Sequence, residues 1–104
     1  MTDLDDRKNA FESKYANDQE TLFRIEARAV KLLGLWAAQE MGLSGDDAAN
    51  YAGDLVAHNL KEPGLGDVTS KVSADLTAKG KPANTVDAML VNFLRDAETQ
   101  IRAA

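Results

Sequence analysis

The stretch DQETLFRIEARAVKLLGLWAAQEM, residues 18–41, decides the fold of this 104-residue chain. Its apolar residues recur every three or four positions, as residues on one side of an α-helix do. The main apolar stripe consists of Leu22, Ile25, Ala29, Leu32, Leu33 and Trp36, and it is broadened by Phe23, Ala27, Val30, Ala37 and Met41. Because so wide a stripe needs several neighbours to cover it, we predict that this helix is central and that Trp36 is substantially buried.

Glycine, proline and capping residues divide the rest of the chain into three further helical segments. The expected stop and start signals are Gly42, Ser44, Pro63, Gly80 and Asn84. The second helix is therefore expected between residues 44 and 62, the third near 67–79, and the fourth after residue 84. β-branched residues are sparse and strand-like alternation is absent. Short connections favour antiparallel neighbours, so we predict an all-α four-helix bundle.

Gly34 is unusual because it lies inside the strongest predicted helix. Glycine costs about 1 kcal/mol relative to alanine at such a position. The second helix carries the small residues Ala48 and Ala52 on its predicted apolar face. We therefore expect Gly34 to permit a close crossing of these two helices.

Composition excludes several classes of function. The chain has no cysteine and one histidine, His58, so disulfides, thiolate zinc sites, cysteine nucleophiles and multi-histidine metal sites are ruled out. The formal net charge is −5, which disfavours binding to nucleic acid. The nearest basic run, Arg24, Arg28 and Lys31, is interrupted by Glu26 and is interpreted as a solvated helix face.

The sequence also contains no recognisable motif for catalysis or for ligand binding. The segment 64–71 superficially resembles a phosphate loop, but it lacks the Gly-Lys-Ser/Thr ending and follows no strand. The acidic runs 3–6 and 46–47 do not match a calcium loop. His58 is expected near a helix C-terminus, where its interaction with the helix dipole is favourable. We therefore expect no enzyme activity, no cofactor and no metal ligands.

The expected cellular compartment is inferred from two features of the sequence, the N-terminal residues and the length of the apolar stretches. Residues 1–6 are polar and acidic, unlike the basic start and apolar run of a signal peptide. The longest mostly apolar stretch, residues 30–38, is too short to span a bilayer. We expect a cytoplasmic protein without direct membrane insertion.

An N-terminal arm, residues 1–17, differs from the remainder of the chain, residues 18–104. At 100° per residue, Leu4, Phe11, Tyr15 and Leu22 each project within about 20° of a common direction, while charged residues dominate the other sides. Asn17, with Glu20 three residues later, can start the core helix separately. We predict a mobile helical arm that orders in a groove of a partner protein. The alternative is that Phe11 and Tyr15 cover one end of the bundle.

Several strings in this sequence resemble the zeta subunit family, the ATPase inhibitor subunits of alphaproteobacterial F-type ATP synthases. They are Asp5-Asp-Arg-Lys-Asn-Ala-Phe-Glu-Ser-Lys-Tyr-Ala16, Glu26-Ala-Arg28, Lys31-Leu-Leu-Gly-Leu-Trp-Ala-Ala38, Met41-Gly-Leu and Glu62-Pro-Gly64. The resemblance implies a four-helix protein whose N-terminal helix inserts into the catalytic head near the rotor stalk and blocks ATP hydrolysis.

Carried over by position, the resemblance places the partner-binding residues in the arm. They are Leu4, Asp5, Asp6, Arg7, Phe11, Lys14 and Tyr15. This chain has Leu4 and Tyr15 where phenylalanine is frequent in the family, and Lys8 where glutamate is frequent.

Two hypotheses follow from the sequence. The first is an inhibitor, monomeric when free, that binds the catalytic subunits and rotor stalk of ATP synthase and so lies peripheral to the inner membrane. The second is a small regulatory helical domain that binds a nucleotide or another protein, with weak or vestigial inhibition. Inhibition of ATP hydrolysis by the isolated catalytic head distinguishes them.

Overall fold

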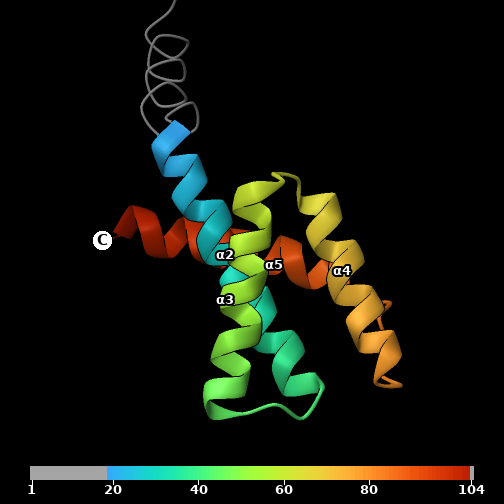
Figure 1. Ribbon diagram of the computed structural model, residues 1–104. Helices are drawn as coiled ribbons and strands as arrows, with labels where there is room; N and C mark the ends of the chain where they lie inside the picture. Colours follow the sequence, from blue (N-terminus) through green and yellow to red (C-terminus); the bar gives the residue numbers. More distant parts are fainter. Residues whose placement is uncertain (1–18, 104) are drawn as a thin grey trace, which may run out of the picture.

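The computed structural model describes residues 19–103, and these form an all-α fold (Figure 1). Its four helices are α2 (Gln19–Glu40), α3 (Gly45–Lys61), α4 (Leu65–Ala78) and α5 (Val86–Ala103). The predicted four-helix fold is confirmed, with boundaries that differ from the expected ones by about two residues. None of the helices in this part of the chain is long and apolar enough to cross a membrane.

Helix α2 is the centre of the fold, as its wide apolar stripe predicts. It packs against each of the other three helices, whereas the backbones of α3 and α5 do not approach each other closely, so these two helices cover different parts of α2. Helix α3 runs antiparallel to α2, and α4 antiparallel to α3, but α5 crosses behind them steeply (Figure 1). The packing is therefore less regular than that of four aligned helices.

The core is built from small and branched aliphatic side chains of all four helices. The largest fully buried ones are Leu33, Leu55, Leu76, Val30, Val68, Val72 and Val86. Trp36 packs against this core but keeps part of its surface in solvent, so its predicted burial is only partial. Leu22, expected on the buried stripe, is 38% exposed. The reason is positional, because the first turns of α2 extend beyond the end of α3 (Figure 1).

Gly42 ends α2 in the predicted way. Its φ is 81°, a left-handed conformation that glycine adopts without strain. The N–H of Leu43 donates to the carbonyl of Ala38 at 2.8 Å, and the N–H of Gly42 donates to that of Gln39 at 3.1 Å. This pair of bonds is the Schellman motif, which satisfies two carbonyls at the end of the helix and turns the chain into α3.

The predicted role of Gly34 is confirmed by its surroundings. A Cβ atom placed there would lie 2.8 Å from the Cα and 3.0 Å from the Cβ of Ala52, and 3.4 Å from Cδ2 of Leu55. Helices α2 and α3 therefore cross with backbone against backbone at this point. Only glycine leaves room for that approach.

Candidate protein-interaction site

The residues predicted to bind a partner lie outside the described residues. These are Leu4, Asp5, Asp6, Arg7, Phe11, Lys14 and Tyr15, all within the arm 1–17. The structure describes instead the part of the chain that follows the arm. The candidate site is therefore built from the first turns of α2 and the side chains around them.

Two large apolar side chains are exposed in these turns. Leu22 is 38% exposed and Phe23 is 56% exposed. They are adjacent in sequence and so point about 100° apart around the helix, toward different flanks of α2. Leu22 has the helical phase expected for Leu4, Phe11 and Tyr15. Leu22 is the one residue of this set that the structure describes, and it is not buried in the core.

A first groove lies on the Leu22 flank, between α2 and α5. Its volume is about 340 Å³. Leu22, Ile25, Glu26, Leu94, Arg95 and Glu98 line it. Its walls carry charges of both signs, so it has no strong preference for an acidic or a basic partner.

A second groove lies on the Phe23 flank and has a different character. Its volume is about 330 Å³, and its apolar lining comes from Phe23 and Ala27 of α2, Val56 of α3 and Ile101 of α5. Its charged lining is entirely basic and consists of Arg24, Arg28 and Lys31. All three residues are exposed, in agreement with their interpretation as a solvated helix face, but the sequence did not show that they border an apolar groove.

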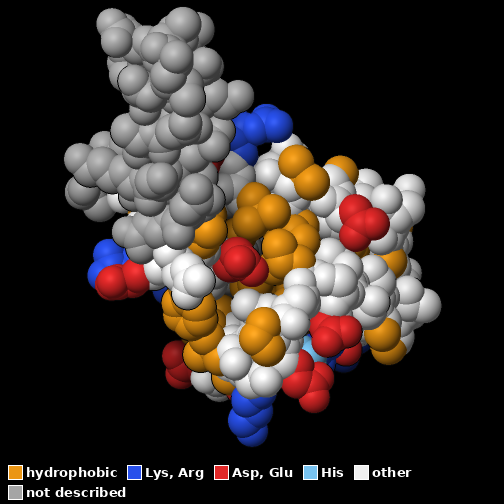
Figure 2. All heavy atoms as spheres, turned by 90° about the horizontal axis from the view of Figure 1, so that it is seen from above, with side chains coloured by type: hydrophobic (Ala, Val, Ile, Leu, Met, Phe, Trp, Pro, Cys, Tyr) orange, Lys and Arg blue, Asp and Glu red, His pale blue; other side chains and the backbone are white. Residues whose placement is uncertain are grey.

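Two of these basic side chains are held in place. Arg28 donates from Nη1 to Oε1 of Gln100 at 3.2 Å, which ties α2 to α5. Arg24 forms an ion pair with Glu20 at 3.0 Å, one helical turn away. Both side chains of this pair are largely exposed, so its contribution to stability is about 0.5 kcal/mol or less. Figure 2 shows hydrophobic side chains gathered in the middle of the face seen from above, with an acidic side chain among them and further charged side chains at the margins.

A polar cluster at the other end of α3 is structural in character. The Tyr51 hydroxyl donates to Oδ2 of Asp75 at 2.7 Å, and Lys71 lies 3.3 Å from the same oxygen. Burial, together with the hydrogen bond and the charge of Asp75, raises the pKa of Tyr51 well above its usual value. Tyr51 therefore remains a neutral donor that links α3 to α4, and it is unsuited to act as a base.

His58 lies in the last turn of α3, as the sequence predicts. Sequence reasoning did not anticipate that two carboxylates, Glu62 and Asp67, lie beside it. The four-residue spacing of His58 and Glu62 was one available signal, since such residues share a helix face. The approach of Asp67 depends on the turn between α3 and α4, which spacing alone does not define.

Comparison with known proteins identifies one family. A family model described as ATPase inhibitor subunit zeta matches residues 1–100 of the chain. No curated protein matches it, and no solved structure does. The match includes the arm as well as α2 to α4 and most of α5.

Proposed function

The chain belongs to the ATPase inhibitor subunit zeta family, a family of non-catalytic regulators, and from this premise we propose how it inhibits. Membership implies that the protein binds ATP synthase. We propose that the arm 1–17 enters the catalytic head of that enzyme as a helix, between catalytic subunits and near the rotor stalk. ATP hydrolysis stops because the rotor cannot turn past a helix wedged there.

The observation that carries this proposal is the exposure of Leu22 at the start of α2. Leu22 shares a helical phase with Leu4, Phe11 and Tyr15, and a continuous helix would place all four on one edge. If α3 and α5 covered that edge completely, Leu22 would be buried, but 38% of its surface is exposed. The exposure of Leu22 supports the proposal that this apolar edge is available to a partner. An amphipathic helix binds a groove through such an edge.

The basic groove on the Phe23 flank fits the same proposal. It begins on α2, directly after the arm in the chain, so a partner that holds the arm lies next to it. We infer that Phe23 and the side chains of Arg24, Arg28 and Lys31 contact the catalytic head beside the entry point of the arm. Arginine and aromatic side chains are the residue types that contribute most to protein interfaces.

The test is inhibition of ATP hydrolysis by the purified catalytic head. Phe11→Ala and Tyr15→Ala should each raise the inhibition constant by about 30-fold or more, the effect of losing about 2 kcal/mol at an interface hot spot. Ser13→Ala is the matched control, because Ser13 lies nine residues after Leu4 and so projects to the opposite side of a helix. It should leave inhibition unchanged.

The proposal makes a second, opposite prediction at Leu4. Leu4→Phe should lower the inhibition constant if the pocket for this residue accommodates the family's commoner phenylalanine. Equal inhibition constants for Phe11→Ala, Tyr15→Ala and Ser13→Ala would contradict the proposed edge. That result would favour the regulatory domain, in which the four helices and not the arm bind the partner.

A further inference from the structure

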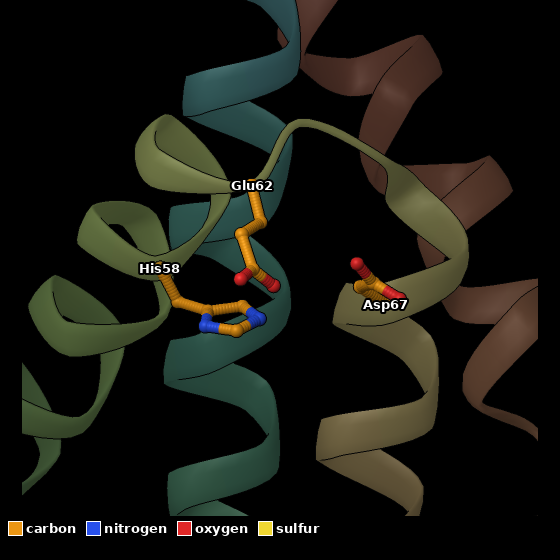
Figure 3. Close-up of side chains that lie close together, drawn as sticks. All are labelled: His58, Glu62 and Asp67. Atoms are coloured by element: carbon orange, nitrogen blue, oxygen red, sulfur yellow. The ribbon is translucent and has the colours of Figure 1, made fainter.

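Three potential metal ligands converge where α3 ends and α4 begins (Figure 3). His58 lies in the last turn of α3, Glu62 follows that helix as its C-cap, and Asp67 lies in the first turn of α4. One imidazole nitrogen and one oxygen from each carboxylate lie within 4.8 Å of one another. The side chains come from both ends of the turn at Pro63 and Gly64.

The convergence of Glu62 and Asp67 is electrostatically unfavourable by itself. Two carboxylates at this separation repel each other, and an exposed position weakens the repulsion without removing it. Among residues 19–103, no lysine or arginine forms an ion pair with either carboxylate, since the ion pairs there involve Glu20, Asp75 and Glu98. In the described part of the chain, the carboxylates of Glu62 and Asp67 therefore have no lysine or arginine to offset their repulsion.

The helix dipole accounts for part of this arrangement. Asp67 is favourable in the first turn of α4, and His58 is favourable near the end of α3. Glu62 is unfavourably placed with respect to α3, because a carboxylate at the C-terminal end of a helix faces its negative pole. The dipole of α3 therefore does not explain why this carboxylate lies beside His58 and Asp67.

The geometry allows one ion to contact all three side chains. Nitrogen and oxygen ligands lie about 2.0–2.2 Å from Zn²⁺, so two ligand atoms on a tetrahedral ion are about 3.3–3.6 Å apart. The three atoms lie within 4.8 Å of one another, so those furthest apart must approach each other by up to about 1.5 Å. Glu62 and Asp67 are exposed, so small rotations of their side chains can supply this movement.

We propose that His58, Glu62 and Asp67 form a site for a divalent transition metal of the zinc class. Imidazole with carboxylates is a ligand set that suits zinc and its neighbours, whereas magnesium and calcium prefer oxygen alone. Water completes the coordination on the exposed side. The bound ion joins the end of α3 to the start of α4 and so holds the turn between them. This site is separate from the arm and does not depend on how the protein inhibits.

The experiment is a Zn²⁺ titration of the full chain, without a histidine tag, followed by imidazole NMR. His58 is the sole histidine of the sequence, so its resonances report ligation at this position unambiguously. Zn²⁺ should shift them and raise the melting temperature, and Mg²⁺ in the same excess should do neither.

Substitution of the carboxylates decides whether they are ligands. Glu62→Gln and Asp67→Asn should each weaken Zn²⁺ binding by more than about tenfold, because even the loss of an outer partner of a ligand costs about 10–100-fold. Asp46→Asn is the matched control, since Asp46 is an exposed acid in the first turn of α3 outside the cluster. It should bind Zn²⁺ as the unmodified chain does.

Two results would overturn the proposal. The first is an imidazole spectrum that does not change in a large molar excess of Zn²⁺. The second is a shift of that spectrum with the same affinity in Glu62→Gln, in Asp67→Asn and in the unmodified chain, because His58 alone would then bind the ion.

Discussion

Gly34→Ala tests the close crossing of α2 and α3. Two effects oppose each other in this variant. Alanine is favoured over glycine inside a helix by about 1 kcal/mol. The new methyl group, however, would lie 2.8 Å from the Cα of Ala52, and that atom belongs to the backbone and cannot rotate away. Overpacking of this kind costs about 1–3 kcal/mol, so the net change should range from about zero to 2 kcal/mol of destabilisation.

Gly53→Ala provides the control that isolates the packing cost. Gly53 lies inside α3, and a Cβ atom placed there meets nothing within 4 Å. This variant gains the helix propensity without the clash and should be stabilised by about 0.5–1 kcal/mol. The propensity gain is common to both variants, so their difference in unfolding free energy, about 1–3 kcal/mol in favour of Gly53→Ala, measures the steric cost.

Urea unfolding followed by circular dichroism gives both values. Since 1 kcal/mol corresponds to about 4–8 °C in a domain of this size, thermal melting should separate the two variants as well. A Gly34→Ala protein as stable as Gly53→Ala would refute the reasoning. It would show that the helices separate at no cost and that glycine is not required at the crossing.

Three further predictions concern other parts of the described structure. Trp36→Ala should cost about 2–3 kcal/mol of unfolding free energy, below the usual range for a fully buried tryptophan, because part of its side chain is in solvent; an unchanged melting temperature would contradict its contact with the core. Tyr51→Phe should cost about 1 kcal/mol at neutral pH through the lost bond to Asp75. Because folding raises the pKa of Tyr51, the stability from this group is fully present below about pH 10 and is lost as pH rises toward the folded pKa, so alkaline titration of stability should be shallower in Tyr51→Phe. Phe23→Ser should weaken inhibition, whereas Val91→Ser, which removes an equally exposed apolar side chain from α5, should not; equal effects would exclude the basic groove from the interface.

The helices and their close crossing could be predicted because their causes are local. Apolar spacing identifies the helices, and Gly42 ends α2 by the hydrogen bonds that its backbone conformation permits. Gly34 was predictable for a related reason. A glycine inside a strong helix is unfavourable unless something approaches closely, and the small residues of α3 identified the approaching element.

The exposure of particular side chains could not be predicted in the same way. Leu22 and Trp36 lie on the apolar stripe, but how far they are covered depends on where α3 and α5 stop along α2. Periodicity defines a helix face and contains no information about the lengths of its neighbours. The same limit explains why the steep crossing of α5 was not anticipated.

The candidate site was predicted as a segment and not as a surface. The seven arm residues came from helical phase and from the family resemblance, and they remain predictions because they precede Gln19, the first residue of α2. The groove bordered by Arg24, Arg28 and Lys31 was missed because Val56 and Ile101 complete it from other helices. Only the tertiary structure brings these residues together.

Deletion of residues 1–16 tests most directly whether the arm is the inhibitory element. The truncated chain keeps Asn17 and Glu20, the predicted start signal of the core helix, together with every core residue that the structure describes, so its melting temperature should change little. Added to the purified catalytic head, it should no longer inhibit ATP hydrolysis at concentrations at which the full chain inhibits completely. A folded, truncated protein that inhibits as strongly as the full chain would contradict the account and would place the inhibitory contact on the four helices.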